Sequence, residues 1–266
     1  MATYPDQAIP LLIVGRQRAG TRFITDFMNE LDEVTLQGEL PNPVMRHIEQ
    51  FMNSVNKYYD KVAASDDDRK QREQRRWQLK REQLLFALWA NCGQSDRVEP
   101  SRDIKYYGYK RPNNEFYFDF YEQMLQHNKP RYVYCIRNFT DNYLSIVSRW
   151  PERDIKQVSD DYLASVRQYQ AMKASASDRV FLFNLDDFSA IGLSYLERQV
   201  LAPLGLSIPD NSRTDFAHRP PINTAADVGV TRRDTLTQSE NDFLNSHPET
   251  NTIFESLSIA PKAQET

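Results

Sequence analysis

Residues 9–28 read Ile-Pro-Leu-Leu-Ile-Val-Gly-Arg-Gln-Arg-Ala-Gly-Thr-Arg-Phe-Ile-Thr-Asp-Phe-Met, and this stretch decides the fold. Its apolar run is typical of a buried strand, while Phe23 and Phe27 begin an apolar pattern at helical spacing. Gly15 and Gly20 therefore lie between a strand and a helix. Because free backbone N–H groups at a helix start bind anions, a phosphate-binding loop is expected at this place.

The loop has the glycine spacing of the nucleotide-binding motif G-x-x-x-x-G-K-[ST] but departs from it at the last two positions. Thr21 stands where the motif has lysine, and Arg22 stands where it has serine or threonine. The loop can still hold an anion, with Arg18 adding positive charge, but it lacks the groups that engage a γ-phosphate and magnesium. The alternative is an ordinary strand–helix turn with surface arginines.

The composition limits the classes of function. The chain has 266 residues, with 33 Lys and Arg against 37 Asp and Glu and a net charge of −4. Because the basic residues are dispersed, no general binding to nucleic acid or to a membrane is expected. Residues 1–10 lack the parts of a secretion signal, and no apolar run is long enough for a membrane span. The sequence predicts a cytoplasmic protein and leaves its oligomeric state open.

The pattern of apolar runs predicts an α/β fold. Such runs recur along the chain with helical stretches between them, at 11–14, 33–37, 104–109, 131–136 and 180–185. This alternation indicates a P-loop-like, three-layer fold with a mainly parallel central sheet flanked by helices. We expect a single domain over 1–266, with a helical insertion at about 43–105 that includes a charged helix near 66–90. The irregular, Pro- and Arg-containing stretch 209–235 is either a surface loop or a lid.

A second candidate anion site follows the strand expected at 131–136. The chain continues as Arg137-Asn138-Phe139-Thr140-Asp141, and a helix is expected over 142–150, before Pro151. Arg137 thus lies at the carboxyl end of a strand, where open α/β sheets place their ligands. Ser145, eight residues later, could hold the same phosphate from a second side. The alternative for Arg137 alone is a surface salt bridge.

Together these motifs resemble those of sulfotransferases that use 3′-phosphoadenosine 5′-phosphosulfate (PAPS). Arg18-Ala19-Gly20-Thr21-Arg22 resembles the family's 5′-phosphosulfate loop, in the Lys-x-Gly-Thr-Arg form of the heparan-sulfate-type branch. Arg137 to Asp141 with Ser145 is similar to the 3′-phosphate motif Arg-Asn-Pro-x-Asp and its following serine. Residues 180–188 and 201–206 also resemble family segments, so the likeness covers about 10–210. Ala19 for serine and Phe139 for proline depart from the pattern without removing a charge.

The resemblance implies which residues bind the donor. Residues 18–22 and Phe23 would hold the phosphosulfate, and Arg137 with Ser145 would hold the 3′-phosphate. Arg232 and Arg233 would form the basic C-terminal loop over the 3′-phosphate and adenine, although other basic residues lie in the same irregular stretch. PAPS would be the sulfuryl donor and adenosine 3′,5′-bisphosphate (PAP) the product. No metal is implied, and the usual spacings of metal ligands do not occur.

The resemblance also indicates catalytic residues. Glu39 follows the expected second strand, and in the heparan-type branch a glutamate in this region is the general base, a role that contributes about 10²–10⁴-fold. The alternative for Glu39 is a loop carboxylate or cap, and His47 is the second candidate base. Lys110 ends the third strand and, with Arg18, would offset negative charge as the S–O bond breaks. Arg111 could exchange roles with Lys110.

The expected function is therefore transfer of a sulfuryl group from PAPS to a hydroxyl by in-line displacement. A carbohydrate or other alcohol is the favoured acceptor, and a phenol, a lipid or a peptide tyrosine stays open. Two alternatives remain at this point. One is a P-loop kinase with a degenerate motif, which Thr21 and Arg22 disfavour. The other is a catalytically silent relative that binds a nucleotide or a glycan.

Overall fold

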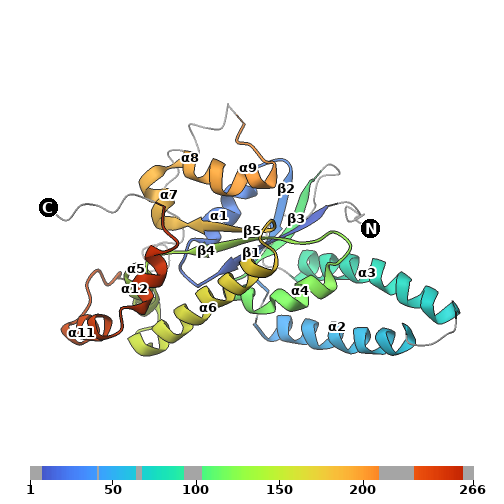
Figure 1. Ribbon diagram of the computed structural model, residues 1–266, viewed down its shortest axis with the longest axis horizontal. Helices are drawn as coiled ribbons and strands as arrows, with labels where there is room; N and C mark the ends of the chain where they lie inside the picture. The colour runs from blue at the N-terminus through green and yellow to red at the C-terminus, as the bar shows by residue number, and fades with distance from the viewer. Residues whose placement is uncertain (1–7, 41, 64–67, 93–103, 210–230, 260–266) are drawn as a thin grey trace. The chain divides into compact units, whose positions relative to one another are not determined.

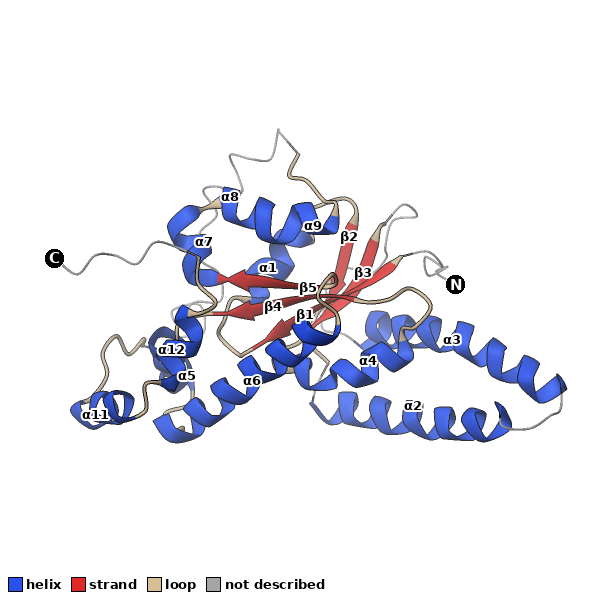
Figure 2. Cartoon of the chain, viewed as in Figure 1, coloured by secondary structure: helices blue, strands red, loops and turns tan. Residues whose placement is uncertain are grey.

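The computed structural model describes residues 8–40, 42–63, 68–92, 104–209 and 231–259. Five parallel strands form the central sheet, flanked by helices, in the order β2-β3-β1-β4-β5 (Figure 2). The α/β fold predicted from the sequence is thus confirmed. The strands are β1 (Ile9–Gly15), β2 (Val34–Gln37), β3 (Tyr106–Lys110), β4 (Arg131–Ile136) and β5 (Val180–Asn184). Each falls on one of the five apolar runs of the sequence.

The chain forms two compact units. The first takes residues 1–12, 28–111 and 117–131, and the second takes 13–27, 112–116 and 132–266. Strand β1 contributes its first four residues to the first unit and its last three to the second. The predicted insertion 43–105 belongs wholly to the first unit. Most of the predicted lid, residues 210–230, lies outside the described residues.

Long helices dominate the first unit. Helices α2 (Asn42–Ala63) and α3 (Asp68–Cys92) pack against each other along their lengths (Figure 1), and α4 (Phe118–Met124) packs against α3. Trp89 of α3 is fully buried and its ring stacks on Tyr109 of β3 at 5.6 Å between centroids. Strand β2 pairs with β3 so that Gln37 lies opposite Tyr109. The carboxyl ends of these two strands therefore lie side by side.

One glycine in β3 is fixed by close backbone approach. A Cβ atom built on Gly108 would lie 1.6 Å from the carbonyl oxygen of Leu11 in β1. No side chain fits at that distance, so β3 needs glycine in its middle despite the usual cost of glycine in a strand. Strand β3 otherwise carries large buried aromatic residues.

The second unit places helices on both faces of β4 and β5. Its helices are α1 (Thr21–Met28, whose last residue belongs to the first unit), α5 (Phe139–Arg149), α6 (Ile155–Ser175), α7 (Leu185–Ile191), α8 (Leu193–Leu196), the π-helical turn η2 (Glu197–Leu201), α9 (Ala202–Leu204), α11 (Gln238–Ser246) and α12 (Glu249–Glu255). Tyr134 of β4 stacks on Tyr169 of α6 at 4.6 Å, whereas Phe183 of β5 contacts Tyr195 of α8 on the opposite face. Tyr134 and Phe183 thus bury against helices on different faces, as expected because Tyr134 pairs with Leu182 and successive side chains alternate between faces.

Helix α5 begins earlier than the sequence predicts. We expected it over 142–150, but its first residue is Phe139. The Asn138 side chain accepts a hydrogen bond from the N–H of Asp141 at 2.8 Å and so caps the helix. The helix consequently starts directly after Arg137 and Asn138, at the end of β4.

Candidate functional site

The glycine-rich loop joins β1 to α1 in the second unit. Gly15 and Gly20 adopt positive φ angles of 117° and 88°, which glycine tolerates best. Arg18 also has a positive φ, 65°, which is strained for a residue with a side chain. Helix α1 begins at Thr21, so its free N–H groups follow the loop, as the sequence predicts. The loop has the geometry of an anion-binding turn.

The structure brings the two anion motifs together through Arg18 and Ser145. The Nε of Arg18 donates a hydrogen bond to the Oγ of Ser145 at 2.9 Å. Burial lowers the pKa of Arg18, and the positive charges of Arg149 and Arg137 lower it further. Within the described part of the chain, Arg149 forms no ion pair and stacks on Trp150. Positive charge therefore accumulates around Arg18, and a bound anion would relieve the repulsion.

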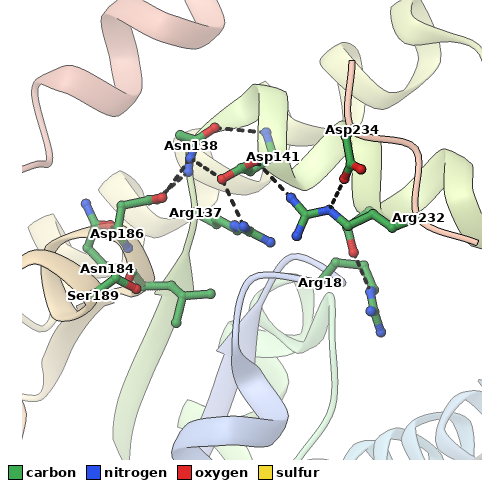
Figure 3. Close-up of polar contacts among 11 residues, drawn as sticks. Arg18, Arg137, Asn138, Asp141, Asn184, Asp186, Ser189, Arg232 and Asp234 are labelled. Carbon is green, nitrogen blue, oxygen red and sulfur yellow. Dashed lines mark hydrogen bonds and ion pairs between the residues drawn. The ribbon is translucent and has the colours of Figure 1, made fainter. Parts of the chain in front are cut away.

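Asp141 links Arg137 to Arg232 (Figure 3). Its carboxylate lies 2.8 Å from Nη2 of Arg137 and 3.3 Å from Nη2 of Arg232, which also pairs with Asp234 at 3.2 Å. Burial raises the pKa of Asp141, but hydrogen bonds from Asn138 and the charge of Arg137 outweigh it, so the net shift is downward. The structure thus places the predicted residues Arg137 and Arg232 around one carboxylate.

Residues of α7 and α6 fix the turn that carries Arg137. The Asn138 backbone N–H and side-chain amide both donate to the Asp186 carboxylate, each at 2.7 Å. The Tyr162 hydroxyl donates to the carbonyl oxygen of Arg137 at 2.8 Å. Two segments far from it in the sequence, α6 and α7, therefore hold the backbone at the end of β4 in one conformation.

Arg233 faces α11 and α5. Its guanidinium forms an ion pair with Glu240, and its backbone N–H donates to the Oγ of Ser148 at 2.8 Å. The Tyr143 hydroxyl also donates to the Glu240 carboxylate. Partial burial raises the pKa of Glu240, but the hydrogen bonds from Arg233 and Tyr143 outweigh it and bring it to about 2. Glu240 thus anchors the described end of the predicted lid to α5.

The other predicted loop residues differ in exposure. Ala19 and Thr21 are buried, whereas Arg22 is exposed and pairs with Asp26 at 3.3 Å. Phe23 packs among aromatic rings of the same unit, with its centroid 5.0 Å from that of Phe188. Arg22 and Phe23 therefore have partners within α1 and its packing layer.

The predicted catalytic pair Glu39 and Lys110 lies in the first unit. The Lys110 ammonium forms an ion pair with the Glu39 carboxylate, and the lysine side chain is 9% exposed while that of Glu39 is 45% exposed. The pairing of β2 with β3 explains this contact, because Lys110 ends β3 and Glu39 lies two residues after the end of β2. The Leu40 N–H donates to the Tyr109 hydroxyl at 2.9 Å, which holds the segment that carries Glu39.

Two further candidates lie near this pair in the sequence. His47 is exposed on α2, and Arg111 is 8% exposed with its guanidinium over the Tyr117 ring. Glu39 is thus a half-buried carboxylate in contact with a buried cation, whereas His47 faces solvent.

The sequence did not indicate the residues that bond the backbone of the loop. The Asn142 side chain donates to the Gln17 carbonyl oxygen at 2.7 Å, and buried Glu115 accepts the Gly15 N–H at 2.9 Å. Asn142 lies within the second motif and could have been considered, but nothing local marks Glu115. In the described ranges, no group of three or more His, Cys, Asp or Glu residues is placed to hold a metal ion. Among the same residues, no helix is both long and apolar enough to cross a membrane.

These features define an α/β protein with a glycine-rich, arginine-bearing loop between a strand and a helix, suited to binding an anionic ligand. A model of the sulfotransferase family matches residues 10–188. The chain therefore belongs to the sulfotransferase family. No curated protein matches the chain significantly.

Solved structures agree with the fold. The sulfotransferase domain of the Synechococcus PCC 7002 olefin synthase is 12% identical, with a TM-score of 0.54 over 98% of this chain and 100% of that one. Sulfotransferase STF9 from Mycobacterium avium is 10% identical, with a TM-score of 0.50 over 94% and 76%. Mouse sulfotransferase SULT7A1, solved with PAP, is 11% identical, with a TM-score of 0.45 over 96% and 84%. At these identities the likeness to the first two structures establishes the fold alone.

Proposed function

We propose that the protein transfers the sulfuryl group of PAPS to a hydroxyl acceptor. The observation that carries this proposal is the hydrogen bond between Arg18 and Ser145, which joins the residues expected at the two ends of the donor. The accumulated charge of Arg18, Arg137 and Arg149 suits a ligand with several negative charges. Family membership supplies the reaction class, and these residues support the choice of donor.

The proposed donor site uses the loop for one phosphate and the start of α5 for the other. Residues 18–22 and the N-terminus of α1 would bind the 5′-phosphosulfate, mostly through backbone N–H groups. Arg137 and Ser145 would bind the 3′-phosphate, with Arg232 and Arg233 beside it. Because Asp141 pairs with Arg137 and Arg232, the 3′-phosphate would compete with that carboxylate for the same guanidinium groups.

For the chemistry, we propose Glu39 as the general base and Lys110 as the cation that offsets developing charge. The acceptor oxygen attacks sulfur as the bond from sulfur to the bridging phosphate oxygen breaks. The acceptor proton passes to the Glu39 carboxylate, and PAP leaves with the electron pair. The contact between Glu39 and Lys110 supports this assignment, because one group would accept the proton while the other stabilises the leaving charge. His47, exposed on α2, is the second candidate base.

The acceptor that we propose is a carbohydrate or another alcohol. The Gly-Thr-Arg form of the loop and the pairing of Glu39 with Lys110 are similar to the heparan-sulfate-type branch, whose acceptors carry such hydroxyl groups. The cytoplasmic location stays a prediction. A kinase reading is not favoured, because Thr21 occupies the place of the lysine that engages a γ-phosphate.

Ligand-dependent melting tests the donor. We expect PAP, at a concentration 100-fold above its dissociation constant, to stabilise the protein by about 2.7 kcal/mol. ATP with magnesium should produce a much smaller shift at the same concentration. The measurement is the melting temperature with each ligand by differential scanning fluorimetry. A shift with ATP and magnesium alone would exclude the proposed donor. Incubating sulfur-labelled PAPS with a panel of acceptors then separates an active enzyme from a silent relative.

A further inference from the structure

A fully buried carboxyl group contacts the first residue of the anion loop. Glu115 lies in the 3₁₀ turn η1 (Asn114–Tyr117), and its side chain has no exposed surface. Its Oε2 accepts a hydrogen bond from the Gly15 N–H at 2.9 Å, across 100 residues of sequence. The N–H of the preceding residue, Asn113, donates to the Gly15 carbonyl oxygen at 2.7 Å. The segment 113–115 therefore holds both polar backbone groups of Gly15.

Glu115 is itself held from the other side. The Ser165 hydroxyl of α6 donates to its Oε1 at 2.5 Å, and the Tyr134 hydroxyl of β4 lies 2.8 Å from the Ser165 Oγ. Since Ser165 donates its proton to the carboxylate, Tyr134 is the donor to Ser165. Both residues are fully buried, so the carboxylate is anchored to a rigid helix and strand of the second unit.

Gly15 can be positioned only through its backbone. A Cβ atom there would lie 2.2 Å from the Cys135 carbonyl oxygen, and its φ of 117° also requires glycine. Burial raises the pKa of Glu115, an effect that the hydrogen bonds from Ser165 and Gly15 and the charge of Arg16 oppose. Burying a carboxyl group costs more free energy than filling the same space with an apolar side chain. The contact with Gly15 gives a physical reason for a glutamate at this position.

We propose that Glu115 is a positioning residue for the donor: by fixing Gly15 it sets the conformation of residues 16–20, and thereby the affinity for the 5′-phosphate end. This inference rests on the proposed function, because it assigns the loop to that end of PAPS. The positioning acts through the backbone of the loop, whereas Arg137 at the other end of the site is held by Asp141 and Tyr162. The two ends can therefore be tested with different ligands.

The test compares Glu115→Leu and Glu115→Gln with the wild-type protein. Calorimetry measures the dissociation constants of PAP, of adenosine 5′-monophosphate and of adenosine 3′-monophosphate. We expect Glu115→Leu to weaken binding of PAP and the 5′-monophosphate about tenfold, the effect of one lost hydrogen bond to a buried donor. Binding of the 3′-monophosphate should weaken much less, because Arg137 keeps its own contacts. Glutamine keeps an acceptor for the Gly15 N–H, so Glu115→Gln should bind PAP within about threefold of wild type.

Glu82→Gln is the matched control. Glu82 is a second buried glutamate that accepts a backbone N–H, from Asn128 at 3.4 Å, but it lies in the first unit. We expect its substitution to leave all three dissociation constants unchanged, even where it lowers the melting temperature. This control separates loss of loop geometry from general destabilisation.

Ser165→Ala keeps the inference testable where Glu115→Leu does not fold. It removes the hydroxyl that fixes Glu115, and we expect the same ligand selectivity with about a threefold effect. Equal binding of PAP by the wild type and every folded variant would overturn the role of Glu115 and leave the proposed function intact. So would an equal loss for both monophosphates. A wild-type protein that binds no PAP would overturn the proposed function and this inference together.

Discussion

The arginines of the proposed donor site already have partners within the protein. Arg18 donates to Ser145, and Arg137 shares the Asp141 carboxylate with Arg232. Such contacts keep long side chains close to the orientation that a ligand needs, which reduces the conformational entropy lost on binding. A carboxylate that holds two guanidinium groups offers them negatively charged oxygen acceptors, as a phosphate does. The free protein is thus arranged around groups that a bound anion can replace.

Substitution of Glu39 should separate binding from chemistry. We expect Glu39→Gln to keep wild-type affinity for PAP and to lose transfer by about 10²–10⁴-fold, because the amide cannot accept the acceptor's proton. Arg137→Ala is the counterpart. It should weaken PAP binding itself, whereas Glu39→Gln should leave PAP affinity unchanged and reduce only the transfer rate. Calorimetry gives the PAP affinity, and sulfur-labelled PAPS with an acceptor found in the panel gives the rate. Full activity of Glu39→Gln would remove Glu39 as the base and leave His47 as the candidate.

Among the elements, α11 is tied to α5 by a cluster of charged and hydroxyl groups. Glu240 of α11 accepts from Arg233, from Tyr143 and from its own helix cap Thr237. The cap and Glu240 form a reciprocal capping box, so the same carboxylate starts the helix and joins it to α5. The attachment therefore depends on the charge of Glu240.

The Glu240 attachment should weaken in acid. The pKa of Glu240 falls from an ordinary 4.5 to about 2, so the folded state favours the carboxylate. Its contribution is fully present above the ordinary pKa and is lost as the pH falls towards 2. The difference in melting temperature between wild type and Glu240→Gln should be constant above about pH 5.5 and shrink below it. Glu249→Gln, an exposed glutamate of α12, is the control. A difference that does not vary with pH would contradict this role.

Local sequence signals predict the helices and strands better than the long-range contacts that hold them in place. The strands were predictable because each is a short apolar run, and the loop was predictable because two glycines lie between a strand and a helix. The sequence pattern predicts the start of α5 three residues late, because the helix begins directly after its Asn138 cap and not at the first residue of the predicted helix, Asn142. Glu115 bonds a residue 100 positions away, and Glu240 bonds one 97 positions away. Nothing in a local pattern specifies such partners, since the fold alone brings them together.

At the scale of the whole molecule, the two units carry different candidate residues. The second unit holds Arg18, Arg137 and Ser145, while the first holds Glu39 and Lys110. Each group of residues is supported within its own unit.

Hydrogen exchange should reveal this division. We expect PAP to slow backbone exchange in residues 15–22, at the start of α5 and near Arg232, because the ligand orders these segments. Exchange in α2 and α3 should change little. Mass spectrometry of the free and PAP-bound protein measures both, and Arg137→Ala at the same PAP concentration should lose most of the protection. Equal protection of α2, α3 and the loop would contradict a donor site confined to the second unit.

The backbone at Arg18 implies a conflict between selection for robustness and selection for activity. Its left-handed conformation suits glycine or asparagine, and its charge lies close to Arg137 and Arg149. A library randomised at position 18 and sorted for heat resistance alone should therefore discard arginine in favour of glycine and asparagine. The same library sorted for PAP binding should retain arginine. Enrichment of arginine in both pools would show that no trade-off exists. If the pools diverge, the arginine at this position reflects selection for ligand binding and not for stability.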